Sequence, residues 1–178
     1  ENAIIPINVG SSPLAFSPTE PYAVVAGRDE TNEFSGLRLW DMTNAQYVWE
    51  DIVRQRVETV AFAGDGKQVA MGGYLPFFPG NGQAAQKAYS LIVWDVENHA
   101  ALQTISMPDD FKTVPIAFVA LSQDGQLAAT VARVNDETQI LLVWDVVSGA
   151  ERWRVTDFAA PINAIAFNPN GRTLAVAL

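Results

Sequence analysis

One five-residue stretch occurs three times in this chain and constrains its fold more than any other feature. The copies are Leu37–Asp41, Leu91–Asp95 and Leu141–Asp145. Each copy is an apolar run that ends in Trp-Asp, and a hydrophobic residue and a turn-forming pair follow it. The tryptophans are 54 and 50 residues apart. A repeat of this length indicates a series of similar structural units rather than one core built from unrelated elements.

Three further segments surround each Trp-Asp stretch and predict strands. A segment of apolar and small residues comes first, as in a strand buried on both faces. A turn signal and another apolar strand follow, and Asp-Gly or Asn-Gly in that turn favours a tight hairpin. After the Trp-Asp stretch, a segment that mixes polar and aromatic residues is typical of a half-exposed outer strand. The first segments are 13–18, 59–63, 118–122 and 164–169, and the last are 46–49, 101–104 and 151–154.

The repeating unit is therefore four antiparallel strands, and the fold class is all-β. Complete units are expected at about 13–50, 58–105 and 116–154, with a half unit of two strands at 162–178. The apolar residues within 1–7 are expected to form an outer closing strand.

The repeated Trp-Asp strands and their neighbours resemble the WD40 family. This resemblance implies a β-propeller whose blades are four-stranded antiparallel sheets, with seven blades in a usual ring. The sequence would then supply roughly the first half of such a ring. We expect either the remainder of the same propeller or a second copy to close it, and we favour the first.

The sequence departs from the WD40 pattern in the residues that join each blade together. The resemblance implies a buried hydrogen-bonded set of His, Asp, Ser or Thr, and Trp, with the Asp six residues before the Trp. That position holds Phe34, Ala88 and Thr138 here, and the chain's one histidine, His99, follows a Trp-Asp stretch instead. We expect the set to be missing from every unit and apolar packing to replace it, as in a divergent, bacterial member of the family.

Composition excludes several classes of function. Eleven basic and twenty acidic residues give a net charge of −9, which disfavours nucleic acid as a partner because phosphate would be repelled. No apolar run reaches the roughly 18–20 residues of a transmembrane segment. Cysteine is absent, so disulfides and thiolate chemistry are excluded. The lack of cysteine and the opening Glu1-Asn2-Ala3 resemble exported bacterial propellers, with a cytoplasmic location as the alternative.

The candidate binding surface is the end of the sheets where the second-to-third strand loops and the connections between units lie. The most distinctive feature there is an insertion, Gly72 to Ala88, which we expect to be an irregular loop. Loops of this length are uncommon and often functional. Acidic residues in the neighbouring loops are expected to form a negative rim. The predicted partner-binding residues are Tyr74, Phe77, Phe78, Asp29, Glu30, Asp109, Asp110, Asp136 and Glu137.

Each of these features also has a structural interpretation. The aromatic residues of the insertion could fold back over neighbouring units or pack on another domain, and the acidic residues could serve only solubility. No alternating Asp/Asn loop with a closing Glu indicates a calcium site. Asp41, Asp95 and Asp145 are expected to accept backbone N–H groups in turns rather than to act in catalysis. His99 is expected to be exposed.

We predict a non-enzymatic platform for protein partners, with no cofactor and no metal. No serine-nucleophile elbow, phosphate-binding glycine loop or His-Glu-x-x-His motif occurs. Two alternatives remain open. One is a structural subunit of a larger complex with the insertion docked inside it, and the other is a hydrolase that uses paired carboxylates in the central opening.

Overall fold

The structure is a computed structural model in which residues 13–28, 35–53, 55–77, 86–135 and 137–178 are described. These residues form β-strands and turns, with no helix. The strands are β1 (Leu14–Phe16), β2 (Tyr22–Arg28), β3 (Ser35–Asp41), β4 (Gln46–Val53), β5 (Arg56–Phe62), β6 (Gln68–Phe77), β7 (Gln86–Asp95), β8 (Ala100–Ser106), β9 (Ile116–Leu121), β10 (Leu127–Arg133), β11 (Gln139–Asp145), β12 (Glu151–Val155), β13 (Ala164–Phe167) and β14 (Leu174–Ala177).

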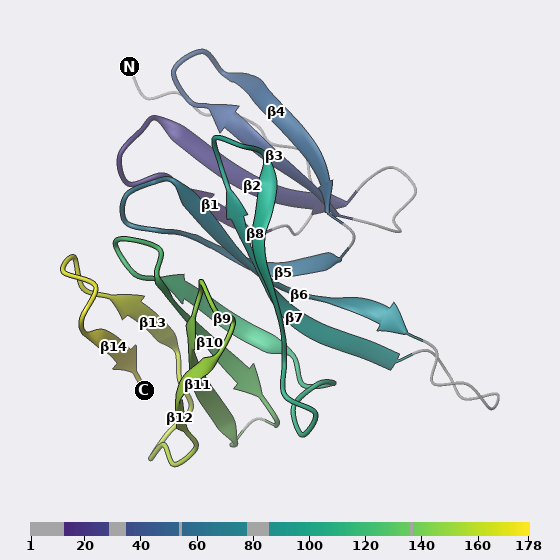
Figure 1. Cartoon of the computed structure of the whole chain (residues 1–178), viewed down its shortest axis with the longest axis vertical. Coiled ribbons are helices and arrows are strands. Elements are labelled where there is room, and N and C mark those ends of the chain that lie inside the picture. The colour runs from purple at the N-terminus through teal and green to yellow at the C-terminus, as the bar shows by residue number, and fades with distance from the viewer. Residues whose placement is uncertain (1–12, 29–34, 54, 78–85, 136) are drawn as a thin grey trace.

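The strands form three four-stranded sheets and one two-stranded sheet, each antiparallel and in chain order. The sheets stack beside one another like the blades of a fan (Figure 1). Contacts join β1 to β5, β5 to β9 and β9 to β13, so the first strand of every sheet lies on the inner side of the stack. The all-β class and the four-stranded propeller blades predicted from the sequence are confirmed. The expected closing strand at residues 1–7 lies outside the described residues.

Tight turns join the first and second strands of the sheets where the sequence predicts them. Gly66, Gly125 and Gly171 have φ values of 73°, 67° and 69°. A residue with a Cβ is strained in this left-handed region, so glycine is the residue that these turns require. Neighbouring turns also touch, because the Asp65 N–H donates to the Gln123 carbonyl at 2.9 Å. The turns therefore form a continuous rim at one end of the strands.

Adjacent blades pack by fitting large residues of one sheet against small residues of the next. Between the second and third blades, Gly72 lies opposite the side chains of Ile116 and Val119. A Cβ added at Gly72 would come within 2.8 and 3.0 Å of their methyl groups. Ala120 and Ala129 likewise belong to the cluster in which Ile165 and Phe167 pack. Since interiors are close-packed, this complementarity fixes the separation between blades.

The tryptophans of the three Trp-Asp strands differ in their hydrogen bonding. The Trp144 indole Nε1–H donates to Thr130 Oγ1 at 3.0 Å within the buried core. The corresponding atoms of Trp40 and Trp94 are buried without a hydrogen-bond partner. The strand registers explain this difference, because the positions equivalent to Thr130 hold Val25 and Met71. The prediction that the hydrogen-bonded set is missing from every unit is therefore wrong for the Trp–Thr pair of the third blade.

The repeated aspartates act as turn acceptors, as predicted. Asp41 Oδ1 accepts the Thr43 N–H at 2.7 Å, and Asp95 Oδ1 accepts the Asn98 N–H at 2.7 Å. Asp145 Oδ1 accepts the Ser148 N–H at 2.8 Å. These bonds hold the carboxylates at the start of each turn, which accounts for their repetition without a catalytic role.

Candidate interaction surface

The insertion between the second and third strands of the second blade is a long β-hairpin, so the expectation of an irregular loop from Gly72 is wrong. Strands β6 and β7 are ten residues each and pair from Gln68↔Asp95 out to Phe77↔Gln86. Residues 78–85, which include the predicted site residue Phe78, lie outside the described residues. The hairpin extends past the other strands of its sheet at the right of Figure 1.

Two features of the sequence that suggest a loop have other functions in this hairpin. β5 pairs with β6 only as far as Arg56↔Tyr74. Pro76 lies beyond this point, where β6 has no neighbouring strand on the β5 side. The N–H that proline lacks therefore interrupts no hydrogen-bonded ladder. A Cβ on Gly73 would collide with the carbonyl oxygen of Arg56. Gly73 therefore permits a close backbone approach beside the irregular pairing between Val57 and Thr59.

Tyr74, a predicted partner-binding residue, is part of the core instead. It is 6% exposed, and its ring lies 5.3 Å from that of Tyr89 on the facing strand. Arg56 Nη1–H donates to Tyr74 Oη at 3.1 Å, and the Lys87 ammonium lies 4.3 Å from the Tyr74 ring centroid. Because side chains alternate along a strand, Tyr74 points inward and its neighbour Leu75, which is 42% exposed, points outward.

The base of the hairpin is held by the connection between the second and third blades. The Tyr89 N–H donates to the Lys112 carbonyl at 2.8 Å, and the Met107 N–H donates to the Tyr89 carbonyl at 3.2 Å. Burial raises the pKa of the Tyr89 phenol, and the neighbouring Glu58 carboxylate raises this pKa further. The phenol therefore stays neutral at neutral pH. The two backbone hydrogen bonds tie the hairpin base to this connection.

A buried polar contact adds to this support. Ser90 Oγ–H donates to Gln55 Oε1 at 2.8 Å, and both side chains are buried. Gln55 lies in the connection between the first and second blades, so the contact ties this connection to β7. Hydrogen-bonded polar groups in a core tolerate little displacement, since a broken bond would leave them unsatisfied.

The predicted acidic rim is only partly described. Asp109, Asp110 and Glu137 are exposed, whereas Asp29, Glu30 and Asp136 lie outside the described residues. Asp110 forms an ion pair with Arg154 Nη1 at 3.1 Å, and the Arg154 guanidinium also pairs with Glu151 Oε2 at 2.7 Å. Arg154 lies over the Phe111 ring, 5.0 Å from its centroid, so Asp110 belongs to a contact between the 107–115 connection and the outer strand β12. Phe77, a predicted partner-binding residue of the hairpin and not of the acidic rim, is the last residue of β6.

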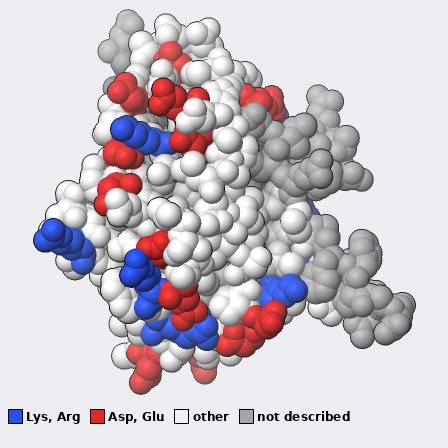
Figure 2. Space-filling view, in the orientation of Figure 1, with Lys and Arg blue, Asp and Glu red and all other residues white. Residues whose placement is uncertain are grey.

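Charged groups of both signs lie side by side on the face seen in Figure 2, which shows no continuous basic area. In the described part of the chain, no group of three or more His, Cys, Asp or Glu residues could hold a metal ion. The described residues also contain no helix long and apolar enough to cross a membrane.

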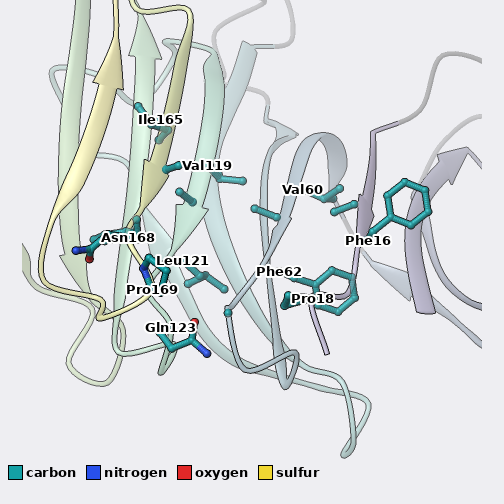
Figure 3. Close-up of a pocket in the computed structure, with 16 residues that line it drawn as sticks. Phe16, Pro18, Val60, Phe62, Val119, Leu121, Gln123, Ile165, Asn168 and Pro169 are labelled. Carbon is teal, nitrogen blue, oxygen red and sulfur yellow. The ribbon is translucent and has the colours of Figure 1, made fainter. Parts of the chain in front are cut away.

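A groove of about 400 Å³ runs along the inner strands, where the central opening of a propeller lies (Figure 3). Its walls come from β1, β5, β9 and β13; most of the lining side chains are apolar, but polar and apolar atoms share the exposed surface about equally. Phe16, Phe62 and Leu121 take equivalent positions on successive strands. Gln123 and Asn168 supply the polar side chains among the described residues that line it. The groove therefore offers polar as well as apolar contacts.

Comparison with known proteins identifies the class of fold. No protein-family model matches this sequence, and no curated protein matches it. Among solved structures, a chain of the Kuenenia stuttgartiensis hydrazine synthase matches with a TM-score of 0.62 and 16% identity. A chain of a mitotic checkpoint complex matches with a TM-score of 0.63 and 16% identity. Each match covers 92% of this chain and 42% of the other, so this chain spans less than half of either neighbour. The fold is a partial β-propeller.

Proposed function

We propose that this chain is part of a divergent WD40-type propeller that acts as a non-enzymatic platform for a protein partner. One of its solved neighbours is titled a synthase and the other a multiprotein complex, so the shared fold does not choose between catalysis and binding. The choice rests on the β6–β7 hairpin. It extends from a fixed base and carries an exposed Leu75.

A hairpin held in this way suits partner binding for an energetic reason. Association costs free energy whenever interface side chains and loops must be ordered. The Tyr74–Tyr89 pair and the Lys112 contact already order the base of the hairpin, so a partner would meet a preformed surface. We therefore assign the partner surface to the outward side of the hairpin rather than to Tyr74.

We also propose that the two outer strands of the fourth blade, whose inner strands are β13 and β14, cover Trp153 and come from the remainder of the same propeller. In the first blade the equivalent residue Trp49 is 9% exposed, since its ring packs 4.7 Å from that of His99 in the second blade. Trp153 is 61% exposed. The corresponding turn, between the third and fourth strands of this fourth blade, would cover it in a seven-bladed ring of the WD40 type. A second copy of the chain is the alternative source.

A shortened hairpin tests the platform function. Replacing residues 76–87 with Asn-Gly joins Leu75 to Ala88 through a two-residue turn and keeps the Tyr74–Tyr89 pair. The chain and this variant would be used to capture proteins from an extract of the source organism, with quantitative mass spectrometry as the measurement. We expect a discrete set of proteins that the chain captures and the variant does not, at an unchanged melting temperature. Equal capture by both would refute the assignment.

Leu75→Ser is the corresponding point variant, and Leu102→Ser is its control. Leu102 is similarly exposed, at 49%, but lies on the outer strand β8. We expect Leu75→Ser to weaken capture of the same proteins and Leu102→Ser to leave it unchanged. If the two variants behave alike, general surface apolarity rather than the hairpin accounts for the capture.

A further inference from the structure

A second candidate site lies at the opposite end of the β6 and β7 strands from Phe77 and Gln86. A pocket of about 270 Å³ is formed where the turns of the first and second blades meet. Leu39 and Val96 contribute apolar surface to it, and Trp49 and His99 form an aromatic wall with ring centroids 4.7 Å apart. β6 runs from beside this pocket at Gln68 to the hairpin at Phe77, so the two surfaces are separated by the length of a blade.

The pocket is a property of this blade boundary and not of every repeat. At the next boundary, the position equivalent to Trp49 holds Gln103. Its Nε2–H donates to the Val147 carbonyl at 3.3 Å, so a polar contact takes the place of an aromatic wall. The turn position equivalent to His99 is occupied there by Gly149. The aromatic pair is therefore specific to the boundary between the first and second blades.

The backbone conformation at His99 is shared with the first blade. His99 and Ala45 both have a φ of 53° at this turn position, and Gly149 has a φ of 70° there in the third blade. A side chain in this left-handed region costs free energy that glycine avoids. The sequence places an imidazole here, in tilted contact with the Trp49 ring at the pocket. Two of the three blades thus carry a side chain at this position, and the contact with Trp49 is what distinguishes His99.

The charges at the mouth indicate what the pocket would bind. Glu20 and Glu97 line it and are exposed, and Lys67 is the one cationic side chain in the described lining. The same turns carry Asp41, Asp65 and Asp95, whose carboxylates accept backbone N–H groups. An apolar pocket with an acidic surround complements an apolar group that has a positive charge beside it.

We propose that this pocket receives a large apolar side chain, Leu, Phe or Trp, from a partner protein in which Lys or Arg is adjacent. The apolar side chain packs between Val96 and the Trp49–His99 pair, and the basic residue lies against Glu20 and Glu97. The inference rests on the proposed platform function, to which it adds a second contact of stated chemistry. It concerns a different end of the blades from the hairpin surface.

Defined peptides test this inference without knowledge of the natural partner. The probes are ten-residue Gly-Ser peptides with one central Phe flanked by Lys, Ser or Glu, and the measurement is fluorescence polarisation against the whole chain. We expect the Lys-flanked peptide to bind most tightly and the Glu-flanked peptide not to bind. Reversing the charge at Glu97 (E97K) should weaken the binding of the Lys-flanked peptide by roughly fivefold to tenfold, because one charge contact is lost and repulsion replaces it.

Two further variants make the test specific. Glu137→Lys changes the net charge equally but lies in the turn between β10 and β11, so it should change binding less than twofold, about the scale of distant screened charges. His99→Gly removes one wall at a position where the third blade has glycine, so it should weaken binding while the chain still folds. Failure of the Lys-flanked peptide to bind, equal binding of the Glu-flanked peptide, or equal effects of E97K and E137K would overturn the proposal.

The hairpin variant separates this result from the platform function. The chain with residues 76–87 replaced by Asn-Gly should bind the Lys-flanked peptide as the unaltered chain does. If no peptide binds while hairpin-dependent capture persists, the pocket proposal alone fails. If peptides bind but the hairpin captures nothing, the hairpin assignment fails and the pocket proposal stands.

Discussion

Replacing Thr130 with Val should destabilise the third blade although the two side chains have nearly the same shape. The Thr130 hydroxyl accepts the Trp144 indole N–H at 3.0 Å, and both residues are buried. Valine removes this acceptor and leaves the indole donor without a partner. An unsatisfied buried donor costs about 1–3 kcal/mol, and the added methyl group recovers about 0.8 kcal/mol through apolar burial. The difference between these two effects is centred near 1 kcal/mol, so we expect a loss of about 1 kcal/mol.

The assay is urea unfolding at neutral pH, followed by both circular dichroism and the fluorescence of the five tryptophans. Coincident transitions would show that one cooperative step is observed. A loss of about 1 kcal/mol lowers the urea midpoint by roughly 0.3–1 M, because stability falls by about 1–3 kcal/mol per molar urea. If the Thr130→Val variant is as stable as the unaltered chain, the hydrogen bond contributes nothing and the reasoning is refuted.

Val25→Thr is the converse change in the first blade. The strand registers place Val25 where the third blade has Thr130, and Trp40 Nε1 is buried without a partner. We expect a gain of about 0.5–1 kcal/mol if the new hydroxyl accepts this donor. Val131→Thr is the control, because Val131 is buried on the opposite face of β10, and it should destabilise the chain.

Three further predictions concern the turns and the blade contacts. A hydrogen bond from Arg152 and others from Ser148 hold the pKa of Asp145 well below its ordinary 3.8. The ionised carboxylate therefore stabilises the fold at neutral pH, and this contribution is lost as the pH falls below about 3.8. Asp145→Asn should therefore lower stability at pH 7 and flatten its decline between about pH 4 and 2 in urea titrations. Gly73→Ala should cost about 3 kcal/mol or more, since a Cβ meets the Arg56 carbonyl oxygen, and normal thermal unfolding of this variant would contradict the structure. Arg154→Ala should cost about 1 kcal/mol or less but speed proteolysis of residues 107–115, and an unchanged cleavage rate would show that the guanidinium does not hold this connection.

The blades could be predicted because several local signals agree within each repeat. The Trp-Asp stretches, the Asp-Gly turns and the segments of apolar and small residues all indicate four-stranded units, and the strand registers confirm them. The Trp144–Thr130 bond was harder to predict. The sequence shows Thr130 among apolar residues, but only the register between β10 and β11 brings its hydroxyl to the indole.

The hairpin shows where sequence signals fail. Gly72, Gly73 and Pro76 are typical of a loop when they are considered alone. In the structure the two glycines allow close packing, and Pro76 lies where β6 has no second neighbour. The burial of Tyr74 depends on Tyr89, fifteen positions later, and no local pattern states that pairing. The alternation of Tyr74 and Leu75 in a strand was the available signal for which side chain faces outward.

The pocket could not be predicted from sequence for a similar reason. Trp49 and His99 belong to different blades, and their contact depends on how the second blade stacks on the first. His99 was expected to be exposed, and it is, yet its ring also covers Trp49. Its position in the turn after Trp-Asp, where another repeat has glycine, is the one feature that could have identified it.

The most direct test of the central claim is photo-crosslinking from the hairpin. A benzophenone amino acid placed at Leu75 would be activated in an extract of the source organism, and the adducts would be identified by mass spectrometry. The same group at Leu102, which is similarly exposed on β8, is the control. The account predicts one or a few adducts of defined mass at position 75 that are absent at position 102. The same adducts at both positions, or none at position 75, would contradict it.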